Sequence, residues 1–322
     1  MLGSWNGKRS FTFGAAAAAV VVAAAPLGGC ARTSGDFTVL SYNVAGLPQE
    51  FSGENPDANI PKISPLLDDY DVVLTQEDFD WWDPLLDGLT FAHYHEQLRA
   101  QATHPHRSAQ WPGPAAAGID PAVRPAPFVG DGLGMLSRMA FTGETRVAWR
   151  DCFGAADTSD GGAADCLAGK GFSVTRMTLA PTRTVDVYNL HGEAGRTDLD
   201  QQFQEDDFVQ LAAYVQTHSA GRAVIVAGDT NLHTNSNHPD GHNGADTAAW
   251  AEFLQATGLT DACDALDCPE VSSIDKVAFR SGTGVTLSAT SHDFPRARFR
   301  DAQGDDLSDH PPLVVGFHWQ KP

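Results

Sequence analysis

Six short polar motifs, spread between residues 42 and 310, constrain the fold of this 322-residue chain more than any other feature. The first four each follow an apolar, β-branched run, which is the pattern typical of a buried strand. The chain is therefore expected to place several polar groups at strand ends. The motifs are Tyr42-Asn43-Val44, Thr75-Gln76-Glu77, Tyr188-Asn189-Leu190-His191, Gly228-Asp229-Thr230-Asn231, Ser273-Ile274-Asp275 and Ser308-Asp309-His310.

Brought together, these motifs would supply carboxylates, amides and two imidazoles. That set suits a hard divalent cation and a phosphate ester. Phosphoryl transfer to water needs a cation to offset charge on the oxygens, a base for the attacking water, and donors for the phosphate. The motifs therefore predict a metal-dependent phosphoesterase.

Four residues are the candidates for the metal and the base. Glu77 comes just after a predicted strand and is the best single Mg²⁺ ligand, because this ion prefers a few carboxylates plus water. Asp309 directly precedes His310, so one loop can hold a carboxylate near the metal and an imidazole near the water. Asp275 could bind the second nitrogen of that imidazole, which fixes its tautomer and raises its basicity.

The remaining candidates face the phosphate. Asp229 and Asn231 are two residues apart in an extended loop and can point the same way, while Asn43 and His191 supply further donors. Each residue has an ordinary alternative: Asp or Asn after a strand is often a turn residue, a histidine such as His191 is often structural, and Glu77 could be a solvated strand end. Six motifs in register are much harder to explain in this way.

The expected elements form one domain over residues 37–322. Residues 103–130, rich in Pro, Ala and Gly, are predicted to be an insertion, either an ordered loop or a mobile lid. Helices are expected at 59–69, 198–218 and 247–257. Strands are expected at 37–43, 71–76, 132–137, 172–179, 184–190, 223–227, 274–280 and 313–318.

The N-terminus is predicted to be a targeting segment. Lys8 and Arg9 precede an apolar run from Phe11 to Leu27, which is short and Ala-rich for a membrane span. Leu27-Gly28-Gly29-Cys30 resembles the bacterial lipobox, whose cysteine is acylated. Residues 1–29 are then a lipoprotein signal peptide and 30–36 an acylated Cys30 with a tether. The alternative is an ordinary cleaved signal. Either way we expect export, and with Cys30 acylated, a lipid anchor to the bacterial cell envelope.

The other four cysteines favour disulfides, because an even number in an exported chain usually pairs. Their spacing suggests Cys152 with Cys166 and Cys263 with Cys268, although the two other pairings stay open. Zinc is the competing explanation, but the spacings lack the usual CxxC pairs.

The charge balance argues against one class of partner. The chain has 21 basic and 41 acidic residues, a formal net charge of −20. Affinity for nucleic acid depends largely on Lys and Arg neutralising phosphates, so no dedicated nucleic-acid binding is expected. Simple solubility is the alternative explanation of the acidity, and a local basic groove is compatible with it.

The motif series resembles the endonuclease/exonuclease/phosphatase superfamily, with the deoxyribonuclease I-like fold. Gly228-Asp229-Thr230-Asn231 and Ser308-Asp309-His310 are its most specific parts, and the resemblance runs from about Phe37 to the end. It implies an α/β fold, a four-layer sandwich of two mostly antiparallel β-sheets flanked by helices, with the site at one end of the sheets.

The resemblance also implies a role for each site residue. Glu77 is the main Mg²⁺ ligand, with Mn²⁺ or Co²⁺ as substitutes, and Asp309 lies near the metal. His310 and Asp275 form the base pair, and Asp229 aligns or protonates. Asp78 departs from the pattern as an extra acid, either a supporting partner or an exposed residue. Asn43, Asn231 and His191 bind the scissile phosphate, with His191 also in the catalytic set.

Within this superfamily the chain is most similar to the secreted neutral sphingomyelinase branch. The supporting stretches are Asp131–Arg138, Lys170-Gly171-Phe172 and Val187–His191 with Glu193-Ala194. The implied reaction is phospholipase C-type hydrolysis of a phospholipid head group by a monomeric enzyme, held at the membrane by its N-terminal lipid. An exported nuclease or phosphomonoesterase of the same fold, and a non-catalytic surface-binding lipoprotein, are the alternatives.

Two further groups of residues are candidates for binding the membrane and a second metal ion. Aromatic residues that prefer the lipid–water interface are Trp81, Trp82, Trp111 and Phe128, with core packing as the alternative for the first two. A second metal could be reached by His233, His238 and His242, for which a solvated loop is the alternative.

Overall fold

The computed structural model describes residues 32–47, 49, 53–83, 90–109, 111, 130–152, 166, 168–195, 197–234, 242–268 and 273–322, without the side chains of 80–83 and 90–92. Arg32–Pro322 form one compact unit. The predicted signal peptide, Cys30, Phe128 and His238 lie outside the described residues. Within the described part, no helix is both long and apolar enough to cross a bilayer.

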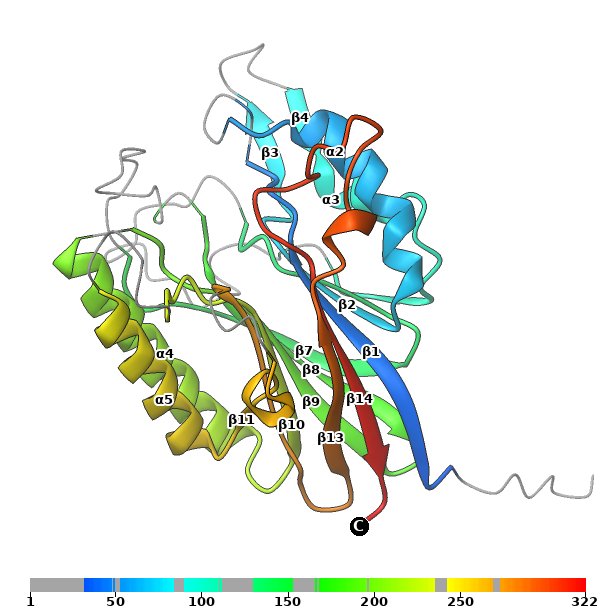
Figure 1. Cartoon of the computed structure of the whole chain (residues 1–322), viewed down its shortest axis with the longest axis vertical. Helices are drawn as coiled ribbons and strands as arrows, with labels where there is room; N and C mark the ends of the chain where they lie inside the picture. The colour runs from blue at the N-terminus through cyan, green and yellow to red at the C-terminus, as the bar shows by residue number, and fades with distance from the viewer. Residues whose placement is uncertain are drawn as a thin grey trace, which may run out of the picture. The chain divides into compact units, whose positions relative to one another are not determined.

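Two six-stranded sheets make up the centre of this unit (Figure 1). The first has the order β13 (Thr286–Asp293), β14 (Leu313–Gln320), β1 (Ser34–Asn43), β2 (Val72–Gln76), β6 (Gly134–Ser137) and β5 (His106–Arg107). The second has the order β11 (Thr260–Asp261), β12 (Asp275–Arg280), β10 (Ala223–Asp229), β9 (Arg183–His191), β8 (Gly171–Ala180) and β7 (Phe141–Ala148).

Each sheet is mostly antiparallel, as predicted. The only parallel neighbours among these described strands are β1 with β2 and β9 with β10. A separate antiparallel hairpin consists of β3 (Asp80–Asp83) and β4 (Thr90–His93).

Three hydrophobic clusters define four layers. The central cluster packs the inner faces of both sheets, with Val39 and Phe317 from one and Val187 and Ile225 from the other. A second cluster joins the outer face of the first sheet to α2 (Pro56–Ile63), the 3-10 helix η1 (Ser64–Asp69) and α3 (Tyr94–Arg99). The third joins the outer face of the second sheet to α4 (Asp198–His218) and α5 (Asn243–Thr257). The predicted four-layer sandwich is confirmed.

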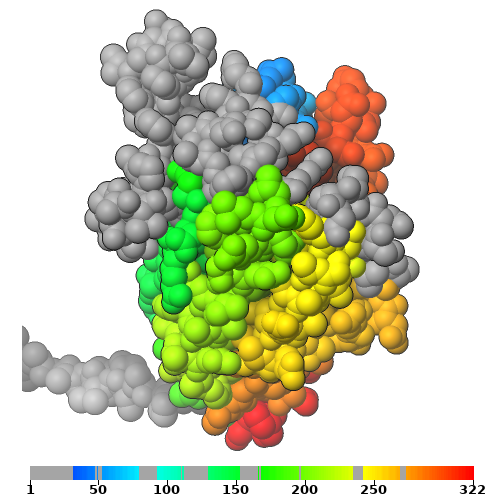
Figure 2. Space-filling view, turned by 90° about the vertical axis from the view of Figure 1, so that its left-hand side faces the viewer, coloured from blue at the N-terminus to red at the C-terminus, as the bar shows by residue number. Residues whose placement is uncertain are grey.

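Figure 2 shows α4 and α5 side by side across one face. α4 begins at the predicted residue because Thr197 and Asp200 form a capping box, each side chain accepting from the other's backbone N–H. α5 starts four residues earlier than predicted and ends at Thr257. The following cap residue, Gly258, has φ of 66°, the left-handed conformation that glycine adopts at low cost. α2 also starts early, with the Asn55 side chain capping it and Pro56 at its first turn.

Strand register aligns the ends of the central strands. In the first sheet Asn43 pairs with Gln76, directly before Glu77. In the second sheet Asp229 pairs with His191 on one side and with Asp275 on the other. Polar residues far apart in the sequence are therefore neighbours at one end of each sheet.

Both predicted disulfides are present, with Cα–Cα distances of 5.3 Å for Cys152–Cys166 and 5.0 Å for Cys263–Cys268. These cysteines are thus not zinc ligands. The edge strand β5 lies in the first part of the predicted insertion at 103–130, and residues 110 and 112–129 lie outside the described part.

Candidate active site

Asn43, at the end of β1, joins carboxylates of both sheets. Its Nδ2 donates hydrogen bonds of 3.0 Å to Glu77 Oε1 and of 3.0 Å to Asp229 Oδ2. Its Oδ1 accepts a 3.0 Å bond from the Ala45 backbone N–H, which fixes the orientation of the amide. Asn43 is fully buried, so the two sheets meet at a rigid polar centre.

The loop before β14 carries the imidazole of His310 to this centre. His310 Nδ1 lies 3.0 Å from Asp275 Oδ2, and His310 Nε2 lies 3.6 Å from Asp229 Oδ2. Ser308 holds the loop, because its hydroxyl donates to the Asn43 carbonyl at 2.7 Å and accepts from the His310 backbone N–H at 3.2 Å. Since a carboxylate only accepts, Nδ1 carries a proton, and Nε2 is the nitrogen that faces Asp229.

The charges around His310 favour its protonated form. Burial alone would lower the pKa of this imidazole, but the carboxylates of Asp275 and Asp229 raise the pKa well above its usual value. The pKa of Asp229 is itself raised by burial and by Asp275, while His310 and Asn43 oppose the rise. His310 and Asp229 therefore influence each other's protonation, and Asp275 contributes negative charge beside both.

His191 and Asn231 line the same end of the second sheet. His191 Nε2 lies 3.4 Å from Asp229 Oδ2, and the His191 carbonyl accepts a 2.7 Å bond from Trp149 Nε1. Burial, together with the charges of Lys170 and His310, lowers the pKa of His191 well below its usual value, so this imidazole is neutral. Asn231 donates its backbone N–H to Asp229 Oδ1 at 3.0 Å.

Asn231 has a left-handed backbone with φ of 53°. Its side-chain nitrogen, which is predicted to bind the substrate phosphate, already donates one hydrogen bond within the protein, from Nδ2 to the Gly192 carbonyl at 3.1 Å. Gln204 of α4 braces this region, with Nε2 donating to the Glu193 carbonyl at 2.9 Å and to the Asn231 carbonyl at 3.3 Å.

Glu77 and Asp309 fit a divalent cation. Burial and then the nearby negative charge of Asp309 raise the pKa of Glu77 to about 7, and the hydrogen bond from Asn43 opposes the rise. Two carboxylates that repel each other in this way are the ligand type that Mg²⁺ prefers. Glu77 also has φ of 52°, a costly backbone for a residue with a side chain, and such strain is concentrated at functional sites.

A second set of ligand atoms lies beside the first. One atom each from Asp229, Asp275 and His310 lies within 4.8 Å of the other two, which is close enough to hold a metal ion. Asn43 therefore lies between two acidic groups, with Glu77 on one side and the Asp229–Asp275 pair on the other.

Asp78, the extra acid, is a buried partner and not an exposed residue. Its Oδ2 accepts bonds from Arg99 Nη1 at 2.7 Å and Thr75 Oγ1 at 3.0 Å, and His95 Nδ1 lies 3.3 Å from Oδ1. Burial acts to raise the pKa of Asp78, but Arg99 and His95 hold it far below its usual range. This ion pair anchors the loop that presents Glu77.

Sequence reasoning missed Lys170 as a site residue. It is buried, its Nζ lies 3.4 Å from the Gly192 carbonyl, and its charge acts on Glu77, Asp229 and His191. The Lys-Gly-Phe stretch supports the family resemblance. The neighbouring sequence does not indicate, however, that the Lys170 ammonium is buried near two carboxylates and an imidazole.

The structure does not join the extra histidines into a metal site within the described residues. The His233 backbone N–H donates to Asp246 Oδ2 at 2.7 Å, whereas His242 Nε2 lies 3.3 Å from Asp198 Oδ1. Trp111 is partly buried and packs against Ala148, so it belongs to the body of the protein. For Trp81 and Trp82 only the backbone of β3 is described.

The fold and the residues at the ends of its two sheets identify the family of this chain. The chain belongs to the Endonuclease/Exonuclease/phosphatase family, whose model matches residues 40–310. This match covers every motif that the sequence placed at a strand end.

Sphingomyelinases of Mycobacterium tuberculosis and Mycobacterium bovis are similar to the chain, at 35% identity over 306 residues. The aligned region covers 89% of this chain and 53% of each relative. The chain therefore spans about half the length of these curated relatives.

Solved structures share the fold at lower identity. Sphingomyelinase C from Streptomyces griseocarneus has a TM-score of 0.57 and 20% identity, covering 88% of this chain and 99% of that one. A beta toxin variant from Staphylococcus aureus with bound magnesium ions has a TM-score of 0.58 and 13% identity, covering 87% and 99%. An endonuclease/exonuclease/phosphatase from Beutenbergia cavernae has a TM-score of 0.57 and 18% identity, covering 88% and 71%.

Proposed function

We propose that this chain is an exported, Mg²⁺-dependent phosphodiesterase that hydrolyses the head-group phosphodiester of a phospholipid, as a sphingomyelinase does. The observation that carries the reaction is the 3.0 Å contact between His310 Nδ1 and Asp275 Oδ2, with Glu77, Asn43 and Asp229 beside it. A base, phosphate donors and a carboxylate pair for a cation stand within one hydrogen-bonded group. These are the parts that attack of water on a phosphodiester requires.

The proposed base is His310. Asp275 accepts a hydrogen bond from the Nδ1–H group, and Nε2 takes a proton from the attacking water. The water oxygen then forms a bond to phosphorus as the bond between phosphorus and the alcohol oxygen breaks. Asp229 aligns the water or returns a proton to the departing alcohol, and its raised pKa suits the second role. Asn43, Asn231 and neutral His191 are the donors for the non-bridging phosphate oxygens.

Glu77 and Asp309 are the proposed Mg²⁺ ligands. When bound there, Mg²⁺ would supply positive charge that stabilises the developing phosphate charge and offsets Asp309, one of the carboxylates that raise the pKa of His310. The raised pKa of Glu77, caused by burial and then by the negative charge of Asp309, supports a cation between these two carboxylates.

The lipid substrate is supported by the similarity to sphingomyelinases and by the net charge of −20. An acidic protein gains little from the polyanionic backbone of nucleic acid. Export is supported by two disulfides, which persist mainly in oxidising compartments. We extend the proposal to acylation of Cys30, attachment to the bacterial cell envelope through that lipid, and a monomeric enzyme.

The experiment compares three substrates with the soluble protein from Arg32 onward and Mg²⁺. Sphingomyelin vesicles, plasmid DNA and a simple phosphomonoester are assayed side by side, and Asp275→Asn is the matched inactive variant. Release of phosphocholine that depends on Asp275 is the expected result. Cleavage of DNA or of the monoester in its place would reject the lipid substrate, and no hydrolysis of any of the three would reject the enzyme.

A further inference from the structure

Lys276 is a buried cation next to the proposed catalytic residue Asp275. Consecutive residues of a strand point to opposite faces, so the two side chains leave β12 on opposite sides of the sheet. Lys276 is only 7% exposed, and no step of the proposed reaction uses it. Burial of an ammonium ion is costly unless the ion is bonded and compensated, so its position calls for an explanation.

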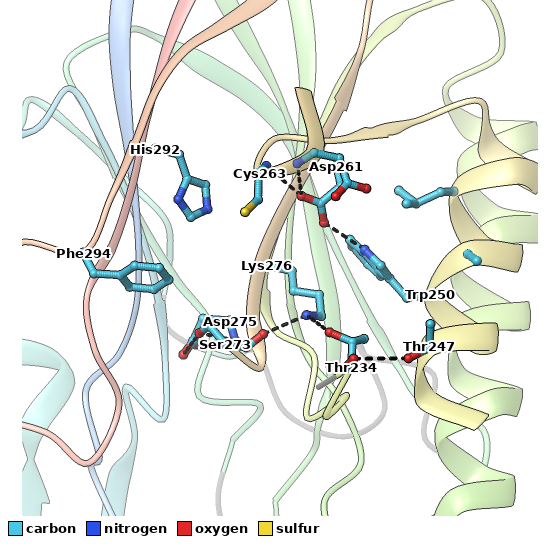
Figure 3. A pocket seen from close by; sticks show the side chains of 13 residues that line it. Thr234, Thr247, Trp250, Asp261, Cys263, Ser273, Asp275, Lys276, His292 and Phe294 are labelled. Atoms are coloured by element: carbon cyan, nitrogen blue, oxygen red, sulfur yellow. Dashed lines mark hydrogen bonds between the residues drawn. The ribbon is translucent and has the colours of Figure 1, made fainter. Parts of the chain in front are cut away.

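The ammonium group of Lys276 bridges two segments that carry catalytic motifs. Nζ donates to the Ser273 carbonyl at 2.7 Å and to Thr234 Oγ1 at 3.0 Å, as Figure 3 shows. Ser273 lies two residues before Asp275, and Thr234 lies three residues after Asn231. One side chain thus sets the distance between the segment before Asp275 and the segment after the Asp229–Asn231 motif.

Ser273 passes this constraint on to Asp275. The Ser273 hydroxyl accepts the Asp275 backbone N–H at 3.1 Å, while the Ser273 carbonyl accepts the Lys276 ammonium. Asp275 is 2% exposed and uses Oδ2 to hold His310 Nδ1. A small shift of Ser273 would therefore move the carboxylate that orients the imidazole.

Acidic and aromatic groups around Lys276 compensate the buried charge. Burial lowers the pKa of Lys276, while Asp261, Asp275 and Asp246 act in the opposite direction. The Trp250 ring centroid lies 6.0 Å from Nζ, within the range of a cation–π contact. The side chain borders a cavity of about 220 Å³ between α5, β12 and β13, which gives small solutes access to it.

We propose that Lys276 is a positioning residue for the Asp275–His310 pair: its ammonium clamps Ser273 and Thr234, and this clamp holds the Asp275 carboxylate on His310 Nδ1. The expected effect on kcat rests on the proposed function, whereas the clamp itself does not. The alternative is that Lys276 stabilises the fold without affecting the catalytic geometry.

Steady-state kinetics of Lys276→Ala provide the first test, with Lys276→Arg as the conservative variant and Lys62→Ala, which removes an exposed lysine, as the control. We expect kcat to fall roughly tenfold in Lys276→Ala, part of the ~10²–10⁴-fold that a positioned base contributes, with KM within about twofold. Lys276→Arg should recover most of the loss, and Lys62→Ala should match the wild type.

Chemical rescue separates positioning from simple stabilisation. Ethylammonium added to Lys276→Ala can enter the cavity and donate to the Ser273 carbonyl and Thr234 Oγ1, so it should restore kcat in a saturable way. Tetramethylammonium at the same concentration has the charge but no N–H donor, and should not restore it. Equal effects of the two ions, or none from either, would overturn the proposal.

A magnetic-resonance measurement tests the clamp without any turnover. The His310 Nδ1 proton bonded to Asp275 should give a downfield proton resonance, assigned by its loss in His310→Asn. We expect this resonance in the wild type and in Lys276→Arg, and its loss or broadening in Lys276→Ala. If the wild type hydrolyses nothing but the resonance still depends on Lys276, the proposed function fails and the positioning role stands.

Thr234→Val provides a second variant should Lys276→Ala fail to fold, since it removes one of the two bonds and keeps the charge. It should lower kcat two- to fivefold with KM unchanged, a loss consistent with one hydrogen bond. Unchanged kcat and an unchanged resonance in Thr234→Val would overturn the clamp. So would a folded Lys276→Ala protein with wild-type kcat.

Discussion

Gln76 Nε2 lies 2.6 Å from Asn189 Oδ1 inside the core between the two sheets. Asn189 Nδ2 in turn donates to the carbonyls of Thr75 at 2.9 Å and Gly134 at 3.1 Å. Gln76 directly precedes Glu77, and Asn189 lies two residues before His191. This buried amide pair therefore ties the proposed metal side of the site to its phosphate side.

Replacement of one amide should destabilise the protein. In Asn189→Leu the buried Gln76 amide loses its 2.6 Å acceptor and keeps only a 3.4 Å bond to the Ser41 hydroxyl. The free energy of unfolding should therefore fall by about 2 kcal/mol, as expected for a poorly satisfied buried polar group. Urea denaturation measures the change. The Gln76→Leu, Asn189→Leu double variant removes both groups and should recover part of the loss. If Gln76→Leu and Asn189→Leu each had the wild-type free energy of unfolding, the pair would not contribute to the stability of the protein.

The proposed base can be removed while its hydrogen bond is kept. In His310→Asn the amide nitrogen takes the place of the imidazole Nδ1 and can still donate to Asp275, but the nitrogen that accepts the water proton is lost. We expect kcat to fall by about 10³-fold, within the usual range for a general base. The melting temperature should stay near that of the wild type, because the amide keeps the hydrogen bond to Asp275.

The double variant His310→Asn, Asp275→Asn provides the matching control. Because the two residues act as one unit, the double variant should lose no more activity than His310→Asn alone. Losses that multiply would mean that Asp275 acts independently of His310.

The ion pair of Asp78 and Arg99 predicts a pH-dependent stability. The pKa of Asp78 is depressed in the folded protein, so its contribution is present above the unfolded-state pKa and declines as the pH falls toward the folded value. Asp78→Asn should therefore be less stable at pH 7, by about 3 kcal/mol, as for a broken buried pair. The difference from the wild type should shrink below about pH 4.

An exposed pair provides the comparison for that experiment. Arg300 and Asp306 lie 2.8 Å apart with side chains 46% and 55% exposed, so Asp306→Asn should have little effect at any pH. Urea denaturation of both variants between pH 3 and pH 7 measures the contrast. Equal effects of the two substitutions would contradict the special role of Asp78.

The central strands could be predicted from the sequence because they are buried on both faces and read as apolar runs. The missed strands of the two sheets, β5, β7, β11 and β13, are their four edges. In β7 and β13 exposed polar residues interrupt the apolar pattern, and β5 and β11 have two residues each. An edge strand has one neighbour and more solvent, so its sequence need not be apolar.

The site shows the same division. Asn43, Glu77, Asp229 and His310 could be proposed from the sequence because each lies in a polar motif, and the motifs of the first three follow a predictable strand. The function of Asp78 depends on Arg99, 21 residues away, and that of Lys276 on Thr234, 42 residues away. Partners of this kind are set by tertiary packing, which local patterns do not encode.

The proposed Mg²⁺ site depends on Glu77, and a metal titration of the enzyme measures this dependence. Phosphocholine release from sphingomyelin vesicles is followed as Mg²⁺ is added to chelator-treated protein, with the wild type and Glu77→Gln compared in parallel. We predict no activity before Mg²⁺, saturable recovery in the wild type, and a loss of at least about 10²-fold in Glu77→Gln at every Mg²⁺ concentration. Equal turnover by the two proteins, or full turnover in the presence of chelator, would contradict it.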